Sequence, residues 1–192
     1  MIITISGNPG SGKSTVAKIL VEKLGLERVY VGGIRRELAK EKGMTLQELN
    51  EYAINHPETD VDVDKKAAAL ARELEKSGKT VVVEGRTQFH FIPESVKVFI
   101  KVDPKEGARR IWKDLQNKET NVQRNEGNFS SLEQVQKRVL EREEEDAKRY
   151  MKYYGIDHRD ERQYNLVVDT TKITAEQAAD KVIKYIKRLK KK

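Results

Sequence analysis

A glycine-rich motif at residues 7–15 constrains the fold of this chain more than any other feature. It reads GNPGSGKST, satisfies the pattern G-x-x-x-x-G-K-[ST], and directly follows the apolar run from Ile2 to Ile5. Between a strand and a helix, successive backbone N–H groups of such a motif surround phosphate oxygens, and the helix N-terminus adds positive charge. We therefore predict an ATP-binding loop formed by Gly7, Asn8, Pro9, Gly10, Ser11, Gly12, Lys13, Ser14 and Thr15.

Two side chains of this loop have specific expected roles. Lys13 is expected to reach the β- and γ-phosphates of a bound nucleotide, which makes it a catalytic candidate. The hydroxyl of Ser14 is expected to bind Mg²⁺. The alternative is a strand-to-helix turn without a ligand, but the match and its position between strand and helix both favour the nucleotide.

The composition favours a soluble protein of one domain. The chain has 192 residues, and no apolar run approaches the roughly 18 residues that span a bilayer. Because the N-terminus enters a predicted strand directly, without a basic start or a cleavage site, we expect a cytoplasmic protein with no membrane partner. We also expect a monomer. There is no cysteine, which excludes disulfides and thiolate-bound zinc, and the three histidines are too scattered to suggest a metal centre.

The formal net charge of +7 is compatible with two kinds of partner. A basic surplus suits nucleic acids, and it also suits single polyanionic nucleotides. Much of the surplus lies in the stretch 184–192, without the interleaved aromatic residues that a stacking platform for bases needs. We therefore expect small-molecule substrates and no nucleic acid, and keep a non-enzymatic, nucleotide-dependent nucleic-acid-binding protein as an alternative.

Five short apolar runs alternate with helical patterns along the chain. Strand-turn-helix units in this order are typical of a parallel sheet that helices cover on both faces. We predict an α/β fold of the three-layer P-loop type with a five-stranded parallel sheet. The predicted strands are Ile2 to Ser6, Val29 to Val31, Thr80 to Glu84, Val96 to Val102 and Leu166 to Val168.

Two helical stretches exceed what a crossover between neighbouring strands needs. The first lies at about 33–77, and its last helix is expected to start at Asp60 or Asp62. The second lies at about 112–155 and loses its hydrophobic periodicity in a polar part before a long charged helix. We predict a single domain with a helical acceptor-binding arm at about 33–77, a helical lid at about 112–155, and a core at 1–32, 78–111 and 160–192.

Arginines that follow two predicted strands suggest a second anion site. Arg36 follows the second strand and Arg86 the third, so both could clamp one acceptor phosphate with their planar guanidinium groups. Glu84 lies at the same edge, beside the phosphate loop if the third strand neighbours the first. Phosphate transfer to a second anion needs such cations on both phosphate groups.

Further arginines lie on two predicted helices. Arg142, Asp146 and Arg149 recur at i, i+4 and i+7, which places them on one helix face. They could serve the acceptor site or form a solvated ion-pair ladder, and the spacing alone does not decide between these. Arg109 and Arg110 are further candidates for stabilising transition-state charge, with ordinary exposed arginines as the alternative.

Beyond the phosphate loop, four more motifs follow in a specific order. They are VGGIRR at 31–36, EGR at 84–86, R-x-x-x-D-x-x-R-Y at 142–150 with YGID at 154–157, and LVVDTT at 166–171. In this order they resemble the cytidylate kinase family within the nucleoside monophosphate kinases, over most of the chain and closest to a compact, archaeal-like type. The resemblance implies transfer of the ATP γ-phosphate to CMP or dCMP, giving CDP or dCDP and ADP, with Mg²⁺ as cofactor.

The resemblance also implies residue roles. Arg109 or Arg110 is similar to the lid arginine on the donor side, and residues near Asp169 would lie along the donor adenine. Glu84 is the expected place of a water-mediated contact to Mg²⁺. By matching position, the acceptor nucleotide would be held by Arg36, Gly85, Arg86, Arg142, Asp146 and Arg149.

The chain departs from the family pattern directly after Arg86. Compact members usually continue with a Leu-Ala-Gly-Trp-like segment, whereas residues 87–91 read TQFHF. Thr87 and Gln88 could present hydrogen bonds to the acceptor base, so the base preference stays open. A P-loop kinase for another nucleoside monophosphate or a small anionic metabolite remains the alternative.

Overall fold

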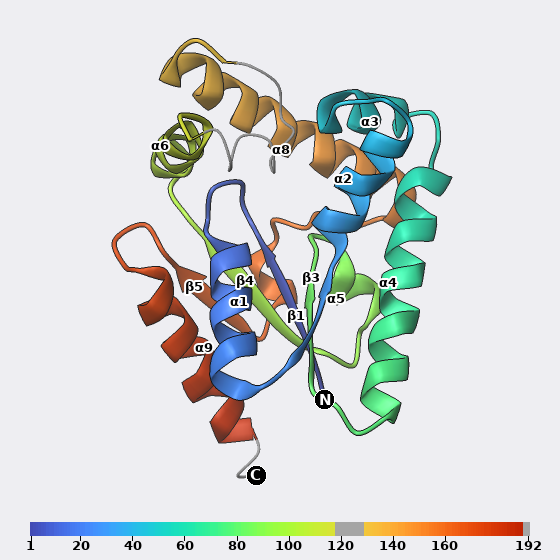
Figure 1. Cartoon of the computed structure of the whole chain (residues 1–192), viewed down its shortest axis with the longest axis vertical. Helices are drawn as coiled ribbons and strands as arrows, with labels where there is room; N and C mark the ends of the chain where they lie inside the picture. Colours follow the sequence, from blue (N-terminus) through green and yellow to red (C-terminus); the bar gives the residue numbers. More distant parts are fainter. Residues whose placement is uncertain (118–128, 190–192) are drawn as a thin grey trace.

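A parallel five-stranded sheet forms the centre of the molecule (Figure 1). The structure is a computed structural model that describes residues 1–117 and 129–189, so part of the predicted lid and the end of the basic tail lie outside the described residues. The predicted α/β fold with a parallel sheet is confirmed, and the strand order is β2-β3-β1-β4-β5. The strands are β1 (Ile2–Gly7), β2 (Glu27–Tyr30), β3 (Val81–Glu84), β4 (Val96–Lys101) and β5 (Leu166–Asp169).

The central strands are buried on both faces because their alternate side chains enter two different cores. Ile3 and Ile5 of β1 pack with α1 (Lys13–Leu24) and α9 (Ala175–Leu189). Ile2 points to the opposite face, where it packs with α4 (Glu58–Lys76). Near-continuous apolar strands are therefore what a sheet between two helical layers requires.

Three helices of the predicted arm follow β2. They are α2 (Val31–Glu41), α3 (Leu46–Tyr52) and α4. Two expected boundaries were wrong. Val31 starts α2 instead of ending the second strand, and α4 starts at Glu58, so that Asp60 is an interior helix residue. This second difference matters because Asp60 is buried and not a cap at the surface.

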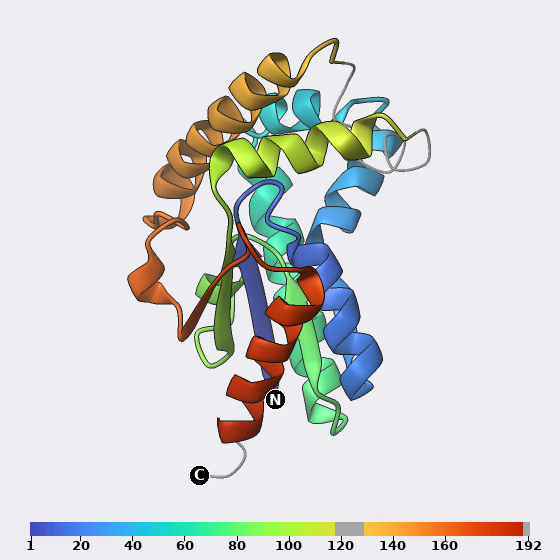
Figure 2. The ribbon, with the colours of Figure 1, turned by 90° about the vertical axis from the view of Figure 1, so that its left-hand side faces the viewer.

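Two further helices lie above the carboxyl edge of the sheet. In Figure 2, α6 (Pro104–Leu115) runs across the top of the phosphate loop, and α8 (Leu132–Tyr154) lies beside it. The two helices pack through an apolar cluster that includes Ile111 and Val139. The short helices α5 (Gln88–Phe91) and η1 (Glu161–Gln163) complete the described elements. The carboxyl ends of the strands are thus covered by helices, and a cavity forms between them.

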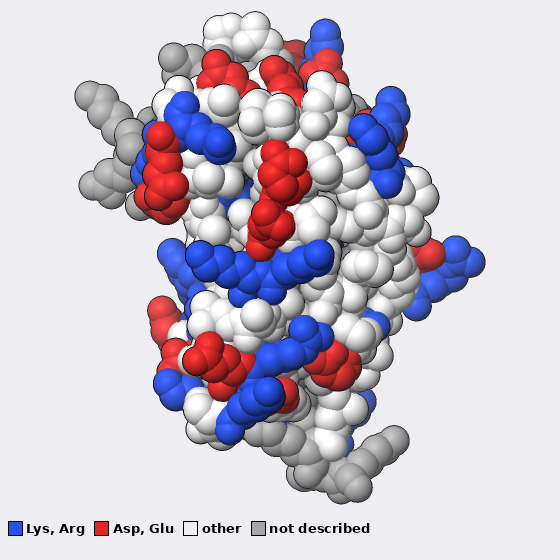
Figure 3. All heavy atoms as spheres, turned by 90° about the vertical axis from the view of Figure 1, so that its right-hand side faces the viewer, with Lys and Arg blue, Asp and Glu red and all other residues white. Residues whose placement is uncertain are grey.

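The outer surface beside the arm is strongly charged but mixed in sign. Figure 3 shows a short band of Lys and Arg side chains across the middle of this face, with groups of Asp and Glu above and below it. Charges of both signs on one face are typical of a solvated surface. Within residues 1–117 and 129–189, no helix is long and apolar enough to cross a membrane.

Candidate active site

The loop between β1 and α1 has the backbone conformation that its glycines make possible. Gly10 has φ +74°, and a Cβ there would come within 2.2 Å of the carbonyl oxygen of Gly107. Gly12 has φ +80° and caps α1, which begins at Lys13. Both positions favour glycine because left-handed backbone strains other residues. The hydroxyl of Ser11 is buried in this loop without a hydrogen-bond partner, which leaves a polar group for a ligand.

Lys13, Ser14 and Glu84 meet at the start of α1. The Ser14 hydroxyl donates a hydrogen bond to the Glu84 carboxylate, whose other oxygen pairs with Arg28. Burial lowers the pKa of Lys13 to about 8, although Glu84 opposes this shift. A hydroxyl and a carboxylate therefore lie together at the place expected for Mg²⁺.

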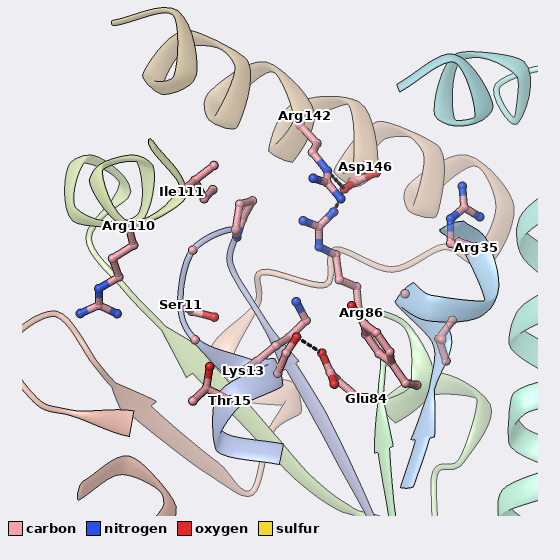
Figure 4. Close-up of a pocket in the computed structure, with 18 of the residues that line it drawn as sticks. Ser11, Lys13, Thr15, Arg35, Glu84, Arg86, Arg110, Ile111, Arg142 and Asp146 are labelled. Atoms are coloured by element: carbon pink, nitrogen blue, oxygen red, sulfur yellow. Dashed lines mark hydrogen bonds and ion pairs between the residues drawn. The ribbon is translucent and has the colours of Figure 1, made fainter. Parts of the chain in front are cut away.

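A cavity of about 570 Å³ lies over this loop and brings together most of the predicted site residues. It extends from the phosphate loop to the arm and to α8 (Figure 4). The predicted residues that line it are Pro9, Gly10, Ser11, Gly12, Lys13, Ser14, Thr15, Arg36, Glu84, Gly85, Arg86, Thr87, Arg109, Arg110, Arg142, Asp146 and Arg149.

Three predicted site residues are not part of this lining. Gly7 is packed against β4, where a Cβ would lie 2.2 Å from the carbonyl oxygen of Ile100. The amide of Asn8 donates a hydrogen bond to Glu143 of α8, so it connects the phosphate loop to the predicted lid. Gln88 is fully buried.

The two arginines that follow β2 and β3 both face the cavity. Arg36 donates to the hydroxyl of Tyr30 at 2.7 Å and to the carbonyl oxygen of Gly32 at 3.0 Å. Arg86 forms an ion pair with Asp146 of α8. Burial, and then the neighbouring Arg142, lowers the pKa of Arg86 to about 10, so Arg86 stays charged at pH 7. Figure 4 shows Arg86 and Arg142 pointing toward each other above the phosphate loop.

The face of α8 that carries Arg142, Asp146 and Arg149 is not a solvated ladder. Asp146 is 1% exposed and Arg149 is 4% exposed. Arg149 donates to Asp146 at 2.6 Å, and Arg142 lies within 4.0 Å of the same carboxylate. Buried charges need such pairing because the protein interior solvates them poorly. The arrangement leaves a dense group of guanidinium groups at one side of the cavity.

Asp60 connects the arm to α8 through this group. Its carboxylate pairs with Arg35 of α2 and accepts a hydrogen bond from Arg149 at 2.6 Å. Arg35 also donates to the side-chain oxygen of Asn50 at 2.8 Å. Charged side chains with little exposure therefore hold the arm and α8 together.

Replacing Asp60 by asparagine is expected to lower the free energy of unfolding by about 3 kcal/mol. The substitution keeps the volume but leaves the buried Arg149 and the partly buried Arg35 with one fewer negative partner. Urea unfolding followed by circular dichroism measures the change. Asp62→Asn is the matched control, since Asp62 is exposed on the same helix and should change stability by less than about 0.5 kcal/mol. Equal effects of the two substitutions would contradict the structural role of Asp60.

Arg109 and Arg110 lie on α6 at the other end of the cavity. Both pair with Glu106, Arg109 at 2.7 Å and Arg110 at 2.8 Å. The Arg109 side chain is 60% exposed, whereas Arg110 also donates to the carbonyl oxygen of Thr170 at 2.7 Å. In Figure 4 Arg110 points away from Arg86. Both arginines are thus near the donor end, and their role in transfer stays a prediction.

Thr87 and Gln88 make different contacts from those expected. The Thr87 hydroxyl donates to Asp64 at 2.7 Å, and the Gln88 amide donates to the same carboxylate at 2.9 Å. Thr87 lines the cavity and so does Asp64. The two residues hold an aspartate of the arm at the cavity wall.

Among the charged residues of this region that sequence reasoning missed are Arg28, Asp60 and Asp64. Arg28 lies two positions before Tyr30, so strand alternation places both side chains on one face, and this was the available signal. Asp60 and Asp64 are one helical turn apart, which places them on one face of α4. Neither spacing indicates which residue of another element each of these side chains contacts.

Comparisons with known proteins agree with this geometry. A family model described as an AAA domain matches residues 3–131. A cytidylate kinase from Archaeoglobus fulgidus is 37% identical over 97% of this chain and 94% of its own length. A cytidylate kinase from Methanocaldococcus jannaschii is 36% identical, with both chains covered completely.

Solved structures share the fold at low sequence identity. An uncharacterized protein from Eubacterium ventriosum aligns with a TM-score of 0.67 and 20% identity, covering 97% of this chain and 98% of that one. Shikimate kinase from Acinetobacter baumannii, in complex with shikimate, aligns with a TM-score of 0.56 and 17% identity, covering 100% of this chain and 95% of the other. These likenesses concern the fold alone. The full-length relatives identify the chain as a member of the cytidylate kinase family, an ATP-dependent nucleoside monophosphate kinase of the P-loop fold.

Proposed function

We propose that this kinase transfers the γ-phosphate of ATP to CMP or dCMP, giving CDP or dCDP and ADP. The observation that carries the proposal is the cavity with cations at both ends, next to full-length similarity to proteins named cytidylate kinase. The phosphate loop with Lys13 forms the donor end. The acceptor end is lined by Arg36, Arg86, Arg142 and Arg149.

The chemistry requires positioning and charge stabilisation. An oxygen of the acceptor phosphate attacks the γ-phosphorus, the bond from that phosphorus to the β,γ-bridging oxygen breaks, and ADP leaves with the electron pair. In the proposed mechanism Arg36 and Arg86 hold the acceptor phosphate, and Lys13 stabilises negative charge that develops between the two nucleotides. Arg142, Asp146 and Arg149 would position the acceptor nucleotide, with Arg109 or Arg110 acting from the donor end.

The residues at the start of α1 fit Mg²⁺. The Ser14 hydroxyl would bind the ion directly and Glu84 through water, since Mg²⁺ prefers oxygen ligands and retains several waters. In the described part of the chain, no group of three or more acidic, histidine or cysteine residues could hold a metal ion. When bound, Mg²⁺ neutralises charge on the phosphate oxygens.

We also assign the active form to a cytoplasmic monomer. One chain supplies residues at both ends of the cavity, so a second copy is not needed to complete it. Light scattering during gel filtration should give a mass near 22.1 kDa.

A substrate panel tests the proposal. ATP, Mg²⁺ and one of CMP, dCMP, UMP or AMP are supplied, and kcat/KM is measured from ADP formation. CMP and dCMP are expected to exceed UMP and AMP by about a hundredfold or more, because a site that hydrogen-bonds a base edge rejects bases that lack the matching group. Removing Mg²⁺ with EDTA should stop the reaction with each acceptor.

Other results would redirect the assignment. Comparable activity with all four nucleotides would contradict specificity for cytosine. Phosphorylation of a different anionic metabolite, with Lys13 still required, would support the alternative kinase. Family membership already favours an enzyme over the nucleic-acid-binding alternative.

A further inference from the structure

Asp64 is a buried carboxylate at the wall of the cavity, and its hydrogen-bond donors are neutral groups. It is 5% exposed and lies on α4. Thr87 donates to it at 2.7 Å, Gln88 at 2.9 Å and the hydroxyl of Tyr154 at 3.0 Å. Within the described residues, no lysine or arginine forms an ion pair with Asp64. Its direct partners are thus neutral donors, while the charges of Asp60 and Arg35 act on it without direct contact.

The other buried aspartates of the acceptor end are different. Asp60 pairs with Arg35 and Arg149, and Asp146 pairs with Arg86 and Arg149. Burial raises the pKa of Asp64 to about 6, although the hydrogen bond from Thr87 opposes the shift. The cavity is rich in arginine, but among the described residues Asp64 forms no ion pair with an arginine. A carboxylate of this kind gains most from a ligand that donates a hydrogen bond.

The hydrogen bonds around Asp64 leave room for such a donor. Thr87 and Tyr154 both bond to Oδ2, whereas Oδ1 accepts only the amide of Gln88, and a carboxylate oxygen can accept two hydrogen bonds. Asp64 itself lines the cavity, whereas Gln88 does not. The open acceptor position on Oδ1 of Asp64 is therefore complementary to an amino group in the cavity.

Pyrimidine bases differ in the group that would face the Asp64 carboxylate. Cytosine carries an exocyclic amine that donates hydrogen bonds, whereas uracil carries a carbonyl oxygen at the same position. Carboxylates of Asp and Glu accept from this cytosine amine in other recognition systems. The carbonyl oxygen of uracil would face the Asp64 carboxylate and be repelled by it.

We propose that Asp64 determines the base specificity of the acceptor site by accepting a hydrogen bond from the exocyclic amine of cytosine. Thr87, Gln88 and Tyr154 act as positioning residues, because they fix the carboxylate and do not themselves read the base. The inference rests on the proposed function and specifies which residue gives it its preference. This also gives a role to the segment 87–91, which departs from the family pattern, because it supplies two of the three hydrogen-bond donors to Asp64.

Asp64→Asn tests the inference. The amide keeps the shape of the side chain but places a donor where the carboxylate had an acceptor. We expect the ratio of kcat/KM for CMP to kcat/KM for UMP to fall about 10- to 100-fold, because hydrogen bonds to charged groups have this weight. The matched control is Asp62→Asn on the exposed face of the same helix, which should leave the ratio unchanged. Thermal unfolding of both variants shows whether they are folded.

The outcomes separate the inference from the proposed function. A wild-type enzyme without a preference for CMP over UMP would contradict the proposed function itself. A clear wild-type preference that persists in Asp64→Asn, even with a lower rate for both nucleotides, would show that Asp64 is only structural. If Asp64→Asn does not fold, Asp64→Glu replaces it. That variant displaces the carboxylate by one methylene, and the ratio is expected to fall at least about tenfold; an unchanged ratio would overturn the inference.

Discussion

Replacing Lys13 by alanine is expected to lower kcat for phosphate transfer about a thousandfold, which corresponds to about 4 kcal/mol of transition-state stabilisation. Lys13 begins α1 and points into the cavity from the phosphate loop (Figure 4). There its ammonium would lie among the phosphate oxygens that carry the developing charge. Steady-state kinetics with saturating ATP and CMP measures the effect.

The control for this variant is Lys18→Ala. Lys18 lies on the same helix but is exposed to solvent, so its removal should change kcat less than twofold. Both variants should unfold within a few degrees of the wild type. Lys13→Ala activity within tenfold of the wild type would show that the phosphate loop does not serve the transfer step.

Replacing Arg86 by alanine is expected to reduce kcat/KM for CMP by about 2 to 4 kcal/mol, or about 30- to 1000-fold. Arg86 follows β3, lines the cavity and meets Asp146 from the opposite side, so its guanidinium lies between the phosphate loop and α8. Affinity for ATP should change less than threefold, because Arg86 is assigned to the acceptor. Isothermal titration with ATP and steady-state kinetics with CMP give the two values.

Two comparisons make this result specific. Arg162→Ala is the matched control, since the Arg162 side chain is 90% exposed and, among the residues that the structure describes, pairs with the nearby Asp160. Arg86→Lys keeps the charge but not the planar pair of donors, and it should restore only part of the activity. Equal losses in ATP affinity and CMP turnover would contradict the assignment of Arg86 to the acceptor.

Much of the fold could be predicted because its signals are local. The apolar strands were recognised from runs that two helical layers must bury, and β3 lies beside β1 as the position of Glu84 required. The errors were at the ends of helices and strands. Val31 was expected to end the second strand but begins α2, and α4 begins at Glu58 and not at the predicted cap Asp60 or Asp62.

The candidate site could be predicted only in part, for a different reason. The spacing of Arg142, Asp146 and Arg149 on one helix face was visible, but their burial depends on the arm, whose Asp60 is 89 positions away from Arg149. Spacing within a helix therefore left the ladder and the buried network equally open. Thr87 and Gln88 were expected to present hydrogen bonds to the acceptor base, which stays a prediction, and their partner Asp64, 23 and 24 positions away, was not foreseen.

The sequence by itself determined the parallel α/β architecture, the phosphate loop and the family resemblance. These follow from short-range periodicity and from the backbone freedom of glycine, which neighbouring residues decide. Only the tertiary structure decided which charges meet. It joined Arg28 to Glu84, buried the Arg149 network, and placed Asp64 at the cavity wall with neutral hydrogen-bond donors. The physical reason is that burial and pairing of a charge depend on elements that approach each other only when the chain has folded.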